Sequence, residues 1–225
     1  MRRLAWAVAV LCLAATVVGC SPSASTPSGS SAKPGDSLLT LPARMAPDGV
    51  AIEVGNANAP KTVLVYEDFQ CPYCARFERV NGPELATRAA AGSIKVRYVI
   101  ASLLDGMLGG ESSARAANAV RASVEVGGFP AYHQWLFDHQ PAEGSDGFTT
   151  EFLLSAAGSV PALNSPAFAD AVRAASYQQW VTASQLAYTN AQQAHPDGVP
   201  TVLIGSIDAN ASLYDRRAFT TLLDR

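Results

Sequence analysis

The pattern of apolar and polar positions divides the chain beyond residue 48 into two sheet-forming parts separated by a helical part. Short β-branched runs at 50–54 and 62–66 flank the turn-rich residues 55–60 and predict two strands. Residues 94–100 alternate apolar and basic side chains, which predicts a third strand. A crossover helix over 73–91 would make the third strand parallel to the second. Pro72 suits the first helical position, and Gly82-Pro83 is expected to kink or break this helix.

The pattern then changes to a helical period. Helices are predicted over 111–125, 129–139, 149–157 and 166–193, and in the last of them the apolar stripe runs along Tyr177, Val181, Ser184, Tyr188 and Ala191. Strand-type sequence returns at 200–205, with a partner strand near 207–213 and a closing helix over 215–224. This order predicts one α/β domain over 49–225, with an all-helical insertion at about 102–195.

The first 48 residues have a different composition. Arg2 and Arg3 precede an apolar run that ends at Gly19-Cys20, which has the order of a secretory signal over 1–19, and the run is too short to span a bilayer. Residues 17–20, Val-Val-Gly-Cys, resemble a bacterial lipobox, so Cys20 is expected to carry a lipid. The alternative is an ordinary secretory signal with an unpaired Cys20. Residues 20–48, rich in Ser, Pro, Ala and Gly at their start, are interpreted as a flexible linker.

Charge and cysteine content narrow the function. Cleavage would remove two arginines and no acidic residue, so the net charge of −3 would become −5, which argues against a nucleic-acid partner. Of the four cysteines, Cys12 leaves with the signal and Cys20 is assigned to the lipid, which leaves Cys71 and Cys74 in the domain. A disulfide between residues three apart closes too small a loop to add much stability. The pair is therefore expected to do redox chemistry.

The predicted position of Cys71, at the start of a helix, suits a nucleophile. Unpaired backbone N–H groups and the positive end of the helix dipole stabilise a thiolate there. Cys74, one turn later, is the expected resolving thiol. A zinc site is not expected, because the only further candidates, His133, His139 and His195, show no pair at ligand spacing and there is no second Cys-x-x-Cys. No metal or cofactor is predicted.

Residues 67–74, Glu-Asp-Phe-Gln-Cys-Pro-Tyr-Cys, resemble the DsbA-like branch of the thioredoxin superfamily when they follow a strand. Residues 129–137 are similar to a motif in the helical insertion of that family, and residues 199–201 resemble its cis-proline loop. The resemblance implies a thioredoxin-like fold with a helical insertion, and an active-site motif that includes Pro72 and Tyr73 between the cysteines of a Cys71–Cys74 disulfide. It also implies that Val199 and Pro200 lie against the cysteines and bind substrate peptide.

One position departs from the family. The buried acid that relatives carry six residues before the first cysteine is Val65 here. Glu67 lies on the same strand face and is a candidate for the proton relay, although an exposed strand-end carboxylate is the alternative. Asp68 is expected to be structural. His133 and His139 are expected to pack against the domain or to line the substrate groove, and His195 to be a loop residue.

The predicted function is a monomeric thiol-disulfide oxidoreductase on the outer face of the bacterial cell membrane, lipid-anchored, or secreted or periplasmic if Cys20 is not lipidated. Its partners would be secreted proteins during folding and a membrane protein that resets the cysteines. Tyr73, in place of a histidine, predicts a reduction potential between those of DsbA and thioredoxin. The alternatives are a disulfide isomerase or reductase of the same fold, and a surface lipoprotein that binds peptides without catalysis.

Overall fold

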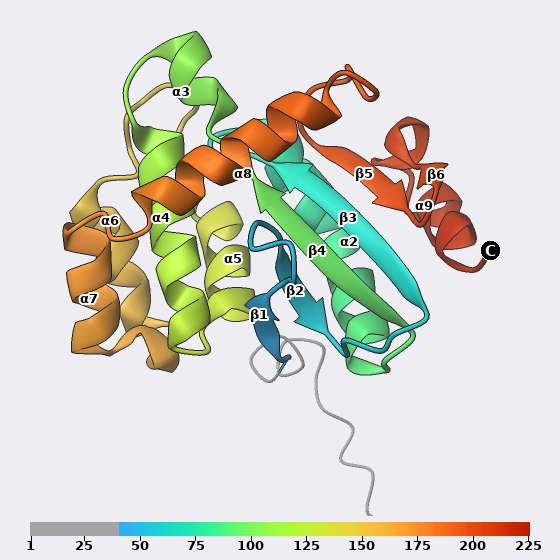
Figure 1. The fold of residues 1–225 in the computed structure, drawn as a ribbon, viewed down its shortest axis with the longest axis horizontal. Helices are drawn as coiled ribbons and strands as arrows, with labels where there is room; N and C mark the ends of the chain where they lie inside the picture. The colour runs from blue at the N-terminus through green and yellow to red at the C-terminus, as the bar shows by residue number, and fades with distance from the viewer. Residues whose placement is uncertain (1–40) are drawn as a thin grey trace, which may run out of the picture. The chain divides into compact units, whose positions relative to one another are not determined.

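A computed structural model of the chain describes residues 41–225 (Figure 1). The predicted signal at 1–19, the lipid on Cys20 and the linker up to residue 40 lie outside the described residues and stay predictions. Within the described part, no helix is both long enough and apolar enough to cross a membrane.

The centre of the domain is a mixed six-stranded sheet in the order β1-β2-β4-β3-β5-β6. Strands β3 and β4 are parallel, as predicted from the crossover helix, and every other neighbouring pair is antiparallel. The strands are β1 (Ala43–Met45), β2 (Ile52–Gly55), β3 (Lys61–Glu67), β4 (Ile94–Ile100), β5 (Thr201–Ile204) and β6 (Ile207–Asp208).

Strand β1 corrects the predicted linker, which extended to residue 48. Ala43 and Met45 pair with β2, and Arg44 forms an ion pair with the buried carboxylate of Glu53. The hairpin between these strands is closed by a hydrogen bond from the Ala46 N–H to the Ala51 carbonyl, 2.8 Å long. The domain therefore begins before residue 49. The sequence did not predict β1, because a three-residue strand is too short to leave a readable pattern.

Helices alternate with strands near both ends of the domain sequence, and a group of helices without strands lies between these two parts. They are α2 (Pro72–Ala90), α3 (Leu103–Leu108), α4 (Ser112–Glu125), α5 (Phe129–Asp138), α6 (Thr150–Ser155), α7 (Pro166–Arg173), α8 (Gln178–Ala191) and α9 (Arg216–Leu223), with short 3₁₀ turns at Ala156–Gly158, Pro161–Leu163 and Asn210–Ser212. Helix α3 was not predicted. The predicted strand at 207–213 is limited to β6, and the 3₁₀ turn occupies part of the rest.

The single helix predicted over 166–193 is two helices. Ala175 has a positive φ of 48°, so the chain leaves α7 before α8 begins. The buried side chain of Asn118, from α4, accepts a hydrogen bond from the Tyr177 N–H (2.8 Å) and donates to the Ala171 carbonyl (3.3 Å). This contact satisfies backbone groups that a continuous helix would have paired internally, and only the tertiary structure supplies it.

Helix α2 continues through Gly82-Pro83 without the predicted break. Asn81 and Gly82 are buried, and the Asn81 amide donates to the Leu213 carbonyl (2.8 Å). Pro83 itself lies on the exposed side of the helix. Packing of the buried residues just before Pro83 therefore outweighs the loss of one ladder hydrogen bond.

Helices cover both faces of the sheet. Helix α8 crosses one face and α2 lies behind the other, with α9 packed on α2 (Figure 1). Side chains of β3 alternate between these faces, so Leu64 and Tyr66 belong to the cluster near α8, whereas Val63 and Val65 belong to the core near α2. Glu67, at the end of β3, therefore points to the α2 side.

Candidate active site

The loop between β3 and α2 carries the cysteines and is fixed by Asp68. The buried Asp68 carboxylate accepts hydrogen bonds from the Gln70 N–H (2.9 Å), the Leu104 N–H (3.0 Å) and the Ser113 hydroxyl (2.6 Å). Burial raises the pKa of Asp68 to about 6, although these donors oppose the shift. The contacts join the loop to α3 and α4 and support the structural role expected for Asp68.

Gln140, just beyond α5, was missed by the sequence analysis. Its side-chain amide donates to the Phe69 carbonyl (2.7 Å) and to the Cys71 carbonyl (3.0 Å). The helical insertion therefore holds the cysteine loop directly. No sequence signal could have shown this contact, because it spans about 70 residues of chain.

Cys71 occupies the N-cap position of α2, with Pro72 as the first helical residue. Its side chain is 5% exposed. The Cys74 thiol donates a hydrogen bond to its sulfur and lowers the pKa of Cys71, helped by the N–H groups of Cys74 and Tyr73, while burial opposes the shift. No acidic side chain lies in the first turn of the helix to compete for these donors. The geometry stabilises Cys71 as a thiolate.

Cys74 has the opposite environment. It is completely buried, and burial raises its pKa well above the usual value for a thiol, with a further contribution from its hydrogen bond to Cys71 and from the charge of Glu67. Both cysteines are free thiols, so the structure represents the dithiol state. The two sulfurs are thus chemically distinct although they lie one helical turn apart.

The loop before β5 lies against Cys71. The Val199–Pro200 peptide bond is cis, and the Cys71 thiol donates to the Val199 carbonyl at 3.5 Å. A surface groove runs from this loop to Tyr73, whose side chain is 60% exposed, and to Tyr214. The structure therefore brings the two predicted segments, 71–74 and 199–200, together at the mouth of one groove.

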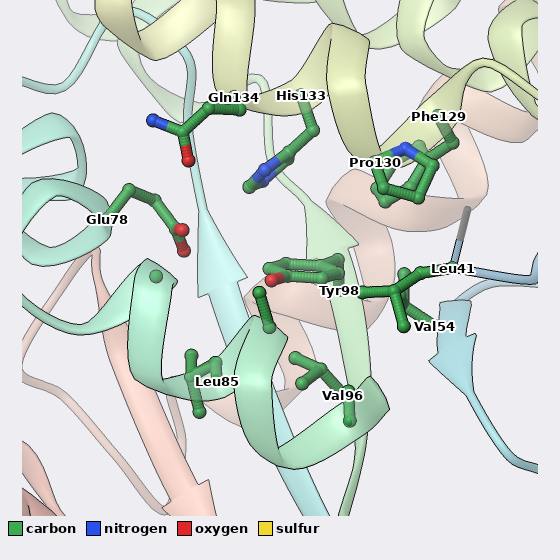
Figure 2. Close-up of a pocket in the computed structure, with 13 residues that line it drawn as sticks. Leu41, Val54, Glu78, Leu85, Val96, Tyr98, Phe129, Pro130, His133 and Gln134 are labelled. Carbon is green, nitrogen blue, oxygen red and sulfur yellow. The ribbon is translucent and has the colours of Figure 1, made fainter. Parts of the chain in front are cut away.

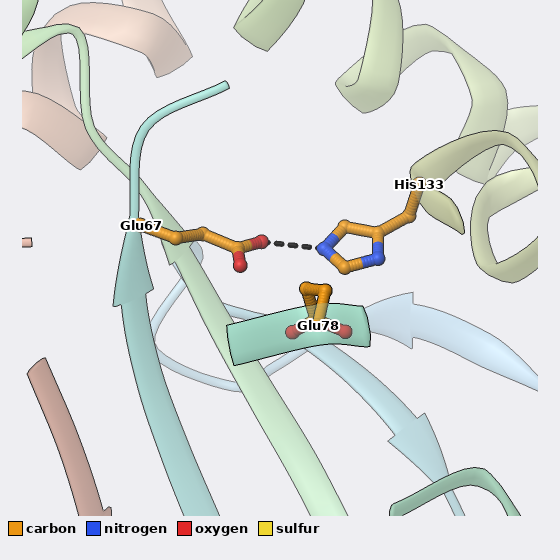
Figure 3. Close-up of side chains that lie close together, drawn as sticks. All are labelled: Glu67, Glu78 and His133. Atoms are coloured by element: carbon orange, nitrogen blue, oxygen red, sulfur yellow. Dashed lines mark hydrogen bonds and ion pairs between the residues drawn. The ribbon is translucent and has the colours of Figure 1, made fainter. Parts of the chain in front are cut away.

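Glu67 is not the exposed strand-end carboxylate that was the alternative from sequence. Its side chain is completely buried, and Oε1 lies 2.5 Å from Nε2 of His133 in a hydrogen bond (Figure 3). Burial raises the pKa of Glu67 well above its ordinary value, and the charge of Asp68 adds to the shift. The strand end is covered because α5 packs over α2 at this point.

His133 packs inside the domain and does not line the substrate groove. Its ring lies among Phe69, Tyr98 and Phe129, with centroid distances of 5.7, 4.5 and 5.4 Å. Burial lowers its pKa. The aromatic packing was expected, but the hydrogen bond to Glu67 was not. His139 stacks on Trp135 and His195 bonds to Asp208 (3.1 Å), so neither joins this group.

Glu78 is a second buried acid that the sequence analysis missed. It is one turn beyond Cys74 on α2, and burial raises its pKa to about 8. A Cβ atom at Gly82 would lie 2.9 Å from Oε2 of Glu78, so the glycine leaves the space that this carboxyl group occupies. A glutamate at an otherwise apolar position of the helix face was the only available signal.

Comparison with known proteins agrees with this architecture. Residues 48–224 match the profile of a thioredoxin family. A search of curated proteins finds no match.

Solved structures of thiol-disulfide oxidoreductases are similar to the chain. MdbA from Corynebacterium diphtheriae has a TM-score of 0.64 at 21% identity and covers 76% of this chain and 89% of its own. Reduced DsbA from Mycobacterium tuberculosis has a TM-score of 0.60 at 24% identity, with 78% of this chain and 98% of its own covered. MdbA from Corynebacterium matruchotii has a TM-score of 0.66 at 16% identity, covering 82% and 95%. The chain belongs to the thioredoxin family, and it shares with these DsbA-type proteins the fold in which a helical subdomain is inserted into the thioredoxin sheet.

Proposed function

We propose that the protein is an extracytoplasmic thiol-disulfide oxidoreductase that forms or exchanges disulfides in secreted proteins. The observation that carries this proposal is the opposite pKa shift of two thiols one turn apart, beside the Val199 carbonyl. A stabilised thiolate next to a buried thiol is the arrangement that disulfide exchange requires. The named activities of the similar solved structures point the same way.

In the oxidising direction, a substrate thiolate attacks the sulfur of Cys71 in the Cys71–Cys74 disulfide. The enzyme disulfide breaks, Cys74 leaves with the electron pair, and a mixed disulfide joins Cys71 to the substrate. The second substrate thiolate then attacks the substrate sulfur of that mixed disulfide and releases Cys71 as a thiolate. The substrate is oxidised and the enzyme is reduced by two electrons.

Glu67 is the proposed acid for Cys74. When Cys74 leaves as a buried thiolate, its high pKa demands a proton from a nearby donor. The carboxyl group of Glu67 is buried on the same side of the sheet and is electrostatically coupled to Cys74, and its raised pKa favours the protonated form that can donate. Glu67 would thus serve in place of the acid that is missing at Val65.

The groove beside the cis-proline loop is the proposed binding site for extended substrate peptide. It includes Tyr73, Val199, Pro200 and Tyr214, which offer aromatic surface next to backbone groups. Backbone pairing at Val199 would hold a peptide irrespective of its sequence. This suits an enzyme with many unfolded clients.

The location and partners follow from the N-terminal sequence and the chemistry. The signal-like segment 1–19 and Cys20 would place the mature protein on the outer face of the cell membrane. The reduced enzyme requires a membrane oxidant that accepts the two electrons gained in each cycle. Mass spectrometry of the mature N-terminus would detect a diacylglycerol on Cys20.

Trapping tests the function in the native envelope. A full-length Cys74→Ala variant should accumulate mixed disulfides through Cys71, because the resolving thiol is absent, and gel separation with and without reductant followed by mass spectrometry would identify the clients. Cys71→Ser is the matched control and should trap nothing. If the Cys74→Ala variant forms no mixed disulfides while Cys71→Ser retains function in cells, a peptide-binding lipoprotein would be the better assignment. Recovery of scrambled ribonuclease without oxidation of a reduced peptide would indicate an isomerase.

A further inference from the structure

The groove beside the cis-proline loop carries negative charge. Besides the loop and the two tyrosines, its lining includes the carboxylates of Asp197 and Asp208, here called the acidic pair, and no lysine or arginine. Asp197 is two residues before Val199, and Asp208 lies in β6, the strand next to β5. The groove has a volume of about 600 Å³, which suits a ligand with several side chains. A segment bound against Val199 would therefore lie within reach of both carboxylates.

The cavity between α2, β4 and α5 is not an alternative site for a peptide. It is lined by Glu78, Tyr98 and His133 among others, and Figure 2 shows these side chains around it. Its free volume is about 20 Å³, which is room for about one water molecule. Neither Cys71 nor the cis-proline loop lines it. The choice of substrate is therefore made in the groove beside Val199.

Asn210 holds both members of the acidic pair in place. Its side-chain amide donates to Oδ2 of Asp197 (2.9 Å), and its backbone N–H donates to Oδ1 of Asp208 (2.8 Å). The amide oxygen of Asn210 accepts a hydrogen bond from the Val202 N–H in β5 (2.9 Å), which ties the arrangement to the sheet. The two carboxylates are thus fixed before a ligand arrives, so little conformational entropy is lost when they bind one.

The charge of the acidic pair is only partly neutralised within the protein. Nδ1 of His195 lies 3.1 Å from Oδ2 of Asp208, whose side chain is 44% exposed. Within residues 41–225, Asp197 takes part in no salt bridge, and its hydrogen-bond donor, Asn210, is neutral. Two carboxylates held by one amide give the groove a negative potential that favours a cationic side chain.

The aromatic part of the groove has a different character. The Tyr73 and Tyr214 ring centroids are 6.5 Å apart, and the Tyr214 hydroxyl donates to the Tyr73 carbonyl at 3.4 Å. The guanidinium group of Arg76 lies 4.4 Å from the centre of the Tyr214 ring, so one face of this ring already holds a cation. A second cation would be repelled there. A basic side chain of a ligand is therefore expected at the acidic pair, and apolar side chains at Tyr73.

The first chemical step favours the same kind of ligand. A substrate cysteine attacks Cys71 as a thiolate, and the acidic pair disfavours a further negative charge nearby. A lysine or arginine beside the substrate cysteine offsets this repulsion and lowers the pKa of the thiol. Binding and reactivity thus require the same feature, a positive charge next to the cysteine.

We propose that the acidic pair selects extended client segments in which a lysine or arginine lies close to the reactive cysteine. The inference rests on the proposed function and names the substrate class of that groove. Asp197 is the main specificity-determining residue, because Asp208 shares its charge with His195. Backbone pairing at Val199 stays independent of sequence, so the acidic pair ranks clients and does not restrict the enzyme to one.

The test compares peptides that differ only in charge. Full-length oxidised protein is mixed with an excess of a short dithiol peptide whose residues flanking the first cysteine are lysine, glutamine or glutamate. Samples are quenched with acid and analysed by mass spectrometry, and the dependence of the rate on peptide concentration gives the apparent dissociation constant and the saturating rate. The rate of each peptide with oxidised glutathione corrects for the intrinsic reactivity of its thiols.

The variants remove or reverse single charges. They are Asp197→Asn, Asp208→Asn and Asp197→Lys. The matched control is Asp170→Asn on α7, which removes one charge from a side chain that is 78% exposed and does not line the groove. The glutamine peptide reports whether a variant is folded and active, since its oxidation does not depend on the acidic pair.

The wild type should bind the lysine peptide about fivefold more tightly than the glutamine peptide, and the glutamate peptide about fivefold more weakly, with saturating rates within about twofold. Asp197→Asn should lower the lysine preference to about twofold and Asp208→Asn to about threefold. Asp197→Lys should reverse the preference, and Asp170→Asn should leave it unchanged. Salt raised from about 0.02 M to about 0.5 M should reduce the wild-type preference to about twofold or less, because screening shortens the reach of exposed charges.

The possible failures are distinct. Equal binding of the three peptides by an active wild type would overturn this inference and leave the proposed function standing, whereas oxidation of none of them would reject the proposed function. A preference that Asp170→Asn lowers as much as Asp197→Asn would show that the net charge of the protein decides, and would also overturn the inference. If Asp197→Asn fails to oxidise the glutamine peptide, Asp208→Asn decides the question, and an unchanged lysine preference there counts against the acidic pair.

Discussion

Cys71 and Cys74 are one helical turn apart on α2, yet their surroundings differ in every respect that controls a thiol. Cys71 caps the helix, receives hydrogen bonds from the Cys74 thiol and from backbone N–H groups, and has a lowered pKa. Cys74 is enclosed in the core beside the charge of Glu67, and its pKa is raised. The comparison teaches that position along one helix turn, with no change of residue type, is enough to shift the pKa of two thiols in opposite directions.

The asymmetry extends beyond the sulfurs. On the Cys71 side the structure supplies hydrogen-bond donors and an open groove at Tyr73. On the Cys74 side it supplies two buried acids and a histidine. One side stabilises a negative charge at an open groove, and the other encloses carboxyl groups whose pKa is raised.

The largest expected effect comes from removing the Cys71 thiol. Cys71→Ser should reduce oxidation of a dithiol peptide to the uncatalysed background, because the other described thiol, Cys74, is completely buried and out of reach of a substrate. Fluorescence of a quenched peptide substrate would measure the oxidation rate.

Iodoacetamide at pH 6 should label wild-type Cys71 much faster than an unstructured peptide thiol, and equal rates would contradict the stabilised thiolate.

The raised pKa of Glu78 predicts that the stability of the protein depends on pH. A folded-state pKa of about 8 for Glu78, above the ordinary value of 4.5, means that the folded protein binds the proton more tightly than the unfolded chain. Its contribution is therefore complete below about pH 4.5 and is lost as the pH rises toward 8. Between pH 5 and 8 the free energy of unfolding should fall by roughly 2–4 kcal/mol more in the wild type than in Glu78→Gln.

Urea denaturation of both proteins at each pH would measure this difference. Glu84→Gln provides the control, since it removes a surface carboxylate from the same helix. Parallel curves for the wild type and Glu78→Gln would show that the buried carboxyl group does not titrate in this range.

Tyr73 lies between the two cysteines in sequence and is expected to affect the reduction potential of the pair. The wild-type reduction potential is expected to fall between about −120 mV, as in DsbA, and about −270 mV, as in thioredoxin. Tyr73→His should make the potential more positive by about 30 mV, a tenfold change in equilibrium constant, because a protonated imidazole stabilises the reduced thiolate. Equilibration in glutathione buffers gives the value. A wild-type potential as low as that of thioredoxin would favour a reductase.

The smallest expected effect concerns Gln140, which supports only the Cys71 side. Gln140→Ala removes two hydrogen bonds to the cysteine loop and should cost about 1–2 kcal/mol of unfolding free energy. The rate of attack by Cys74 should stay within about twofold of wild type, since Gln140 contacts only the carbonyls of Phe69 and Cys71. A selective loss of that step would show that the two sides are coupled through the loop.

Much of the architecture was readable from local pattern. The alternation at 94–100 predicted β4 with its observed bounds, and the crossover over 73–91 correctly predicted that β3 and β4 are parallel. The order of sheet, helical insertion and sheet was also confirmed. These features are local, because strand alternation and helix capping depend on residues within a few positions of each other.

Features that depend on distant residues could not be read in this way. Asn118 binds the backbone where α7 ends and α8 begins. Strand β1 is held by pairing with β2 and by the ion pair between Arg44 and Glu53. The sequence left open whether Glu67 is buried or exposed at the end of its strand, and it is buried because α5 brings His133 against it. Each outcome depends on a contact between segments far apart in the chain.

The sequence by itself predicted which two thiols form the redox pair, since Cys-Pro-Tyr-Cys at a helix start carries its own backbone donors and dipole. Only the tertiary structure decided which carboxyl groups are buried with a raised pKa, because the pKa of a carboxyl group depends on burial and neighbouring charge. Glu67, Glu78 and His133 are separated by up to 66 residues and meet only when β3, α2 and α5 pack together. These three residues share no sequence motif, so no local pattern could have shown that they meet.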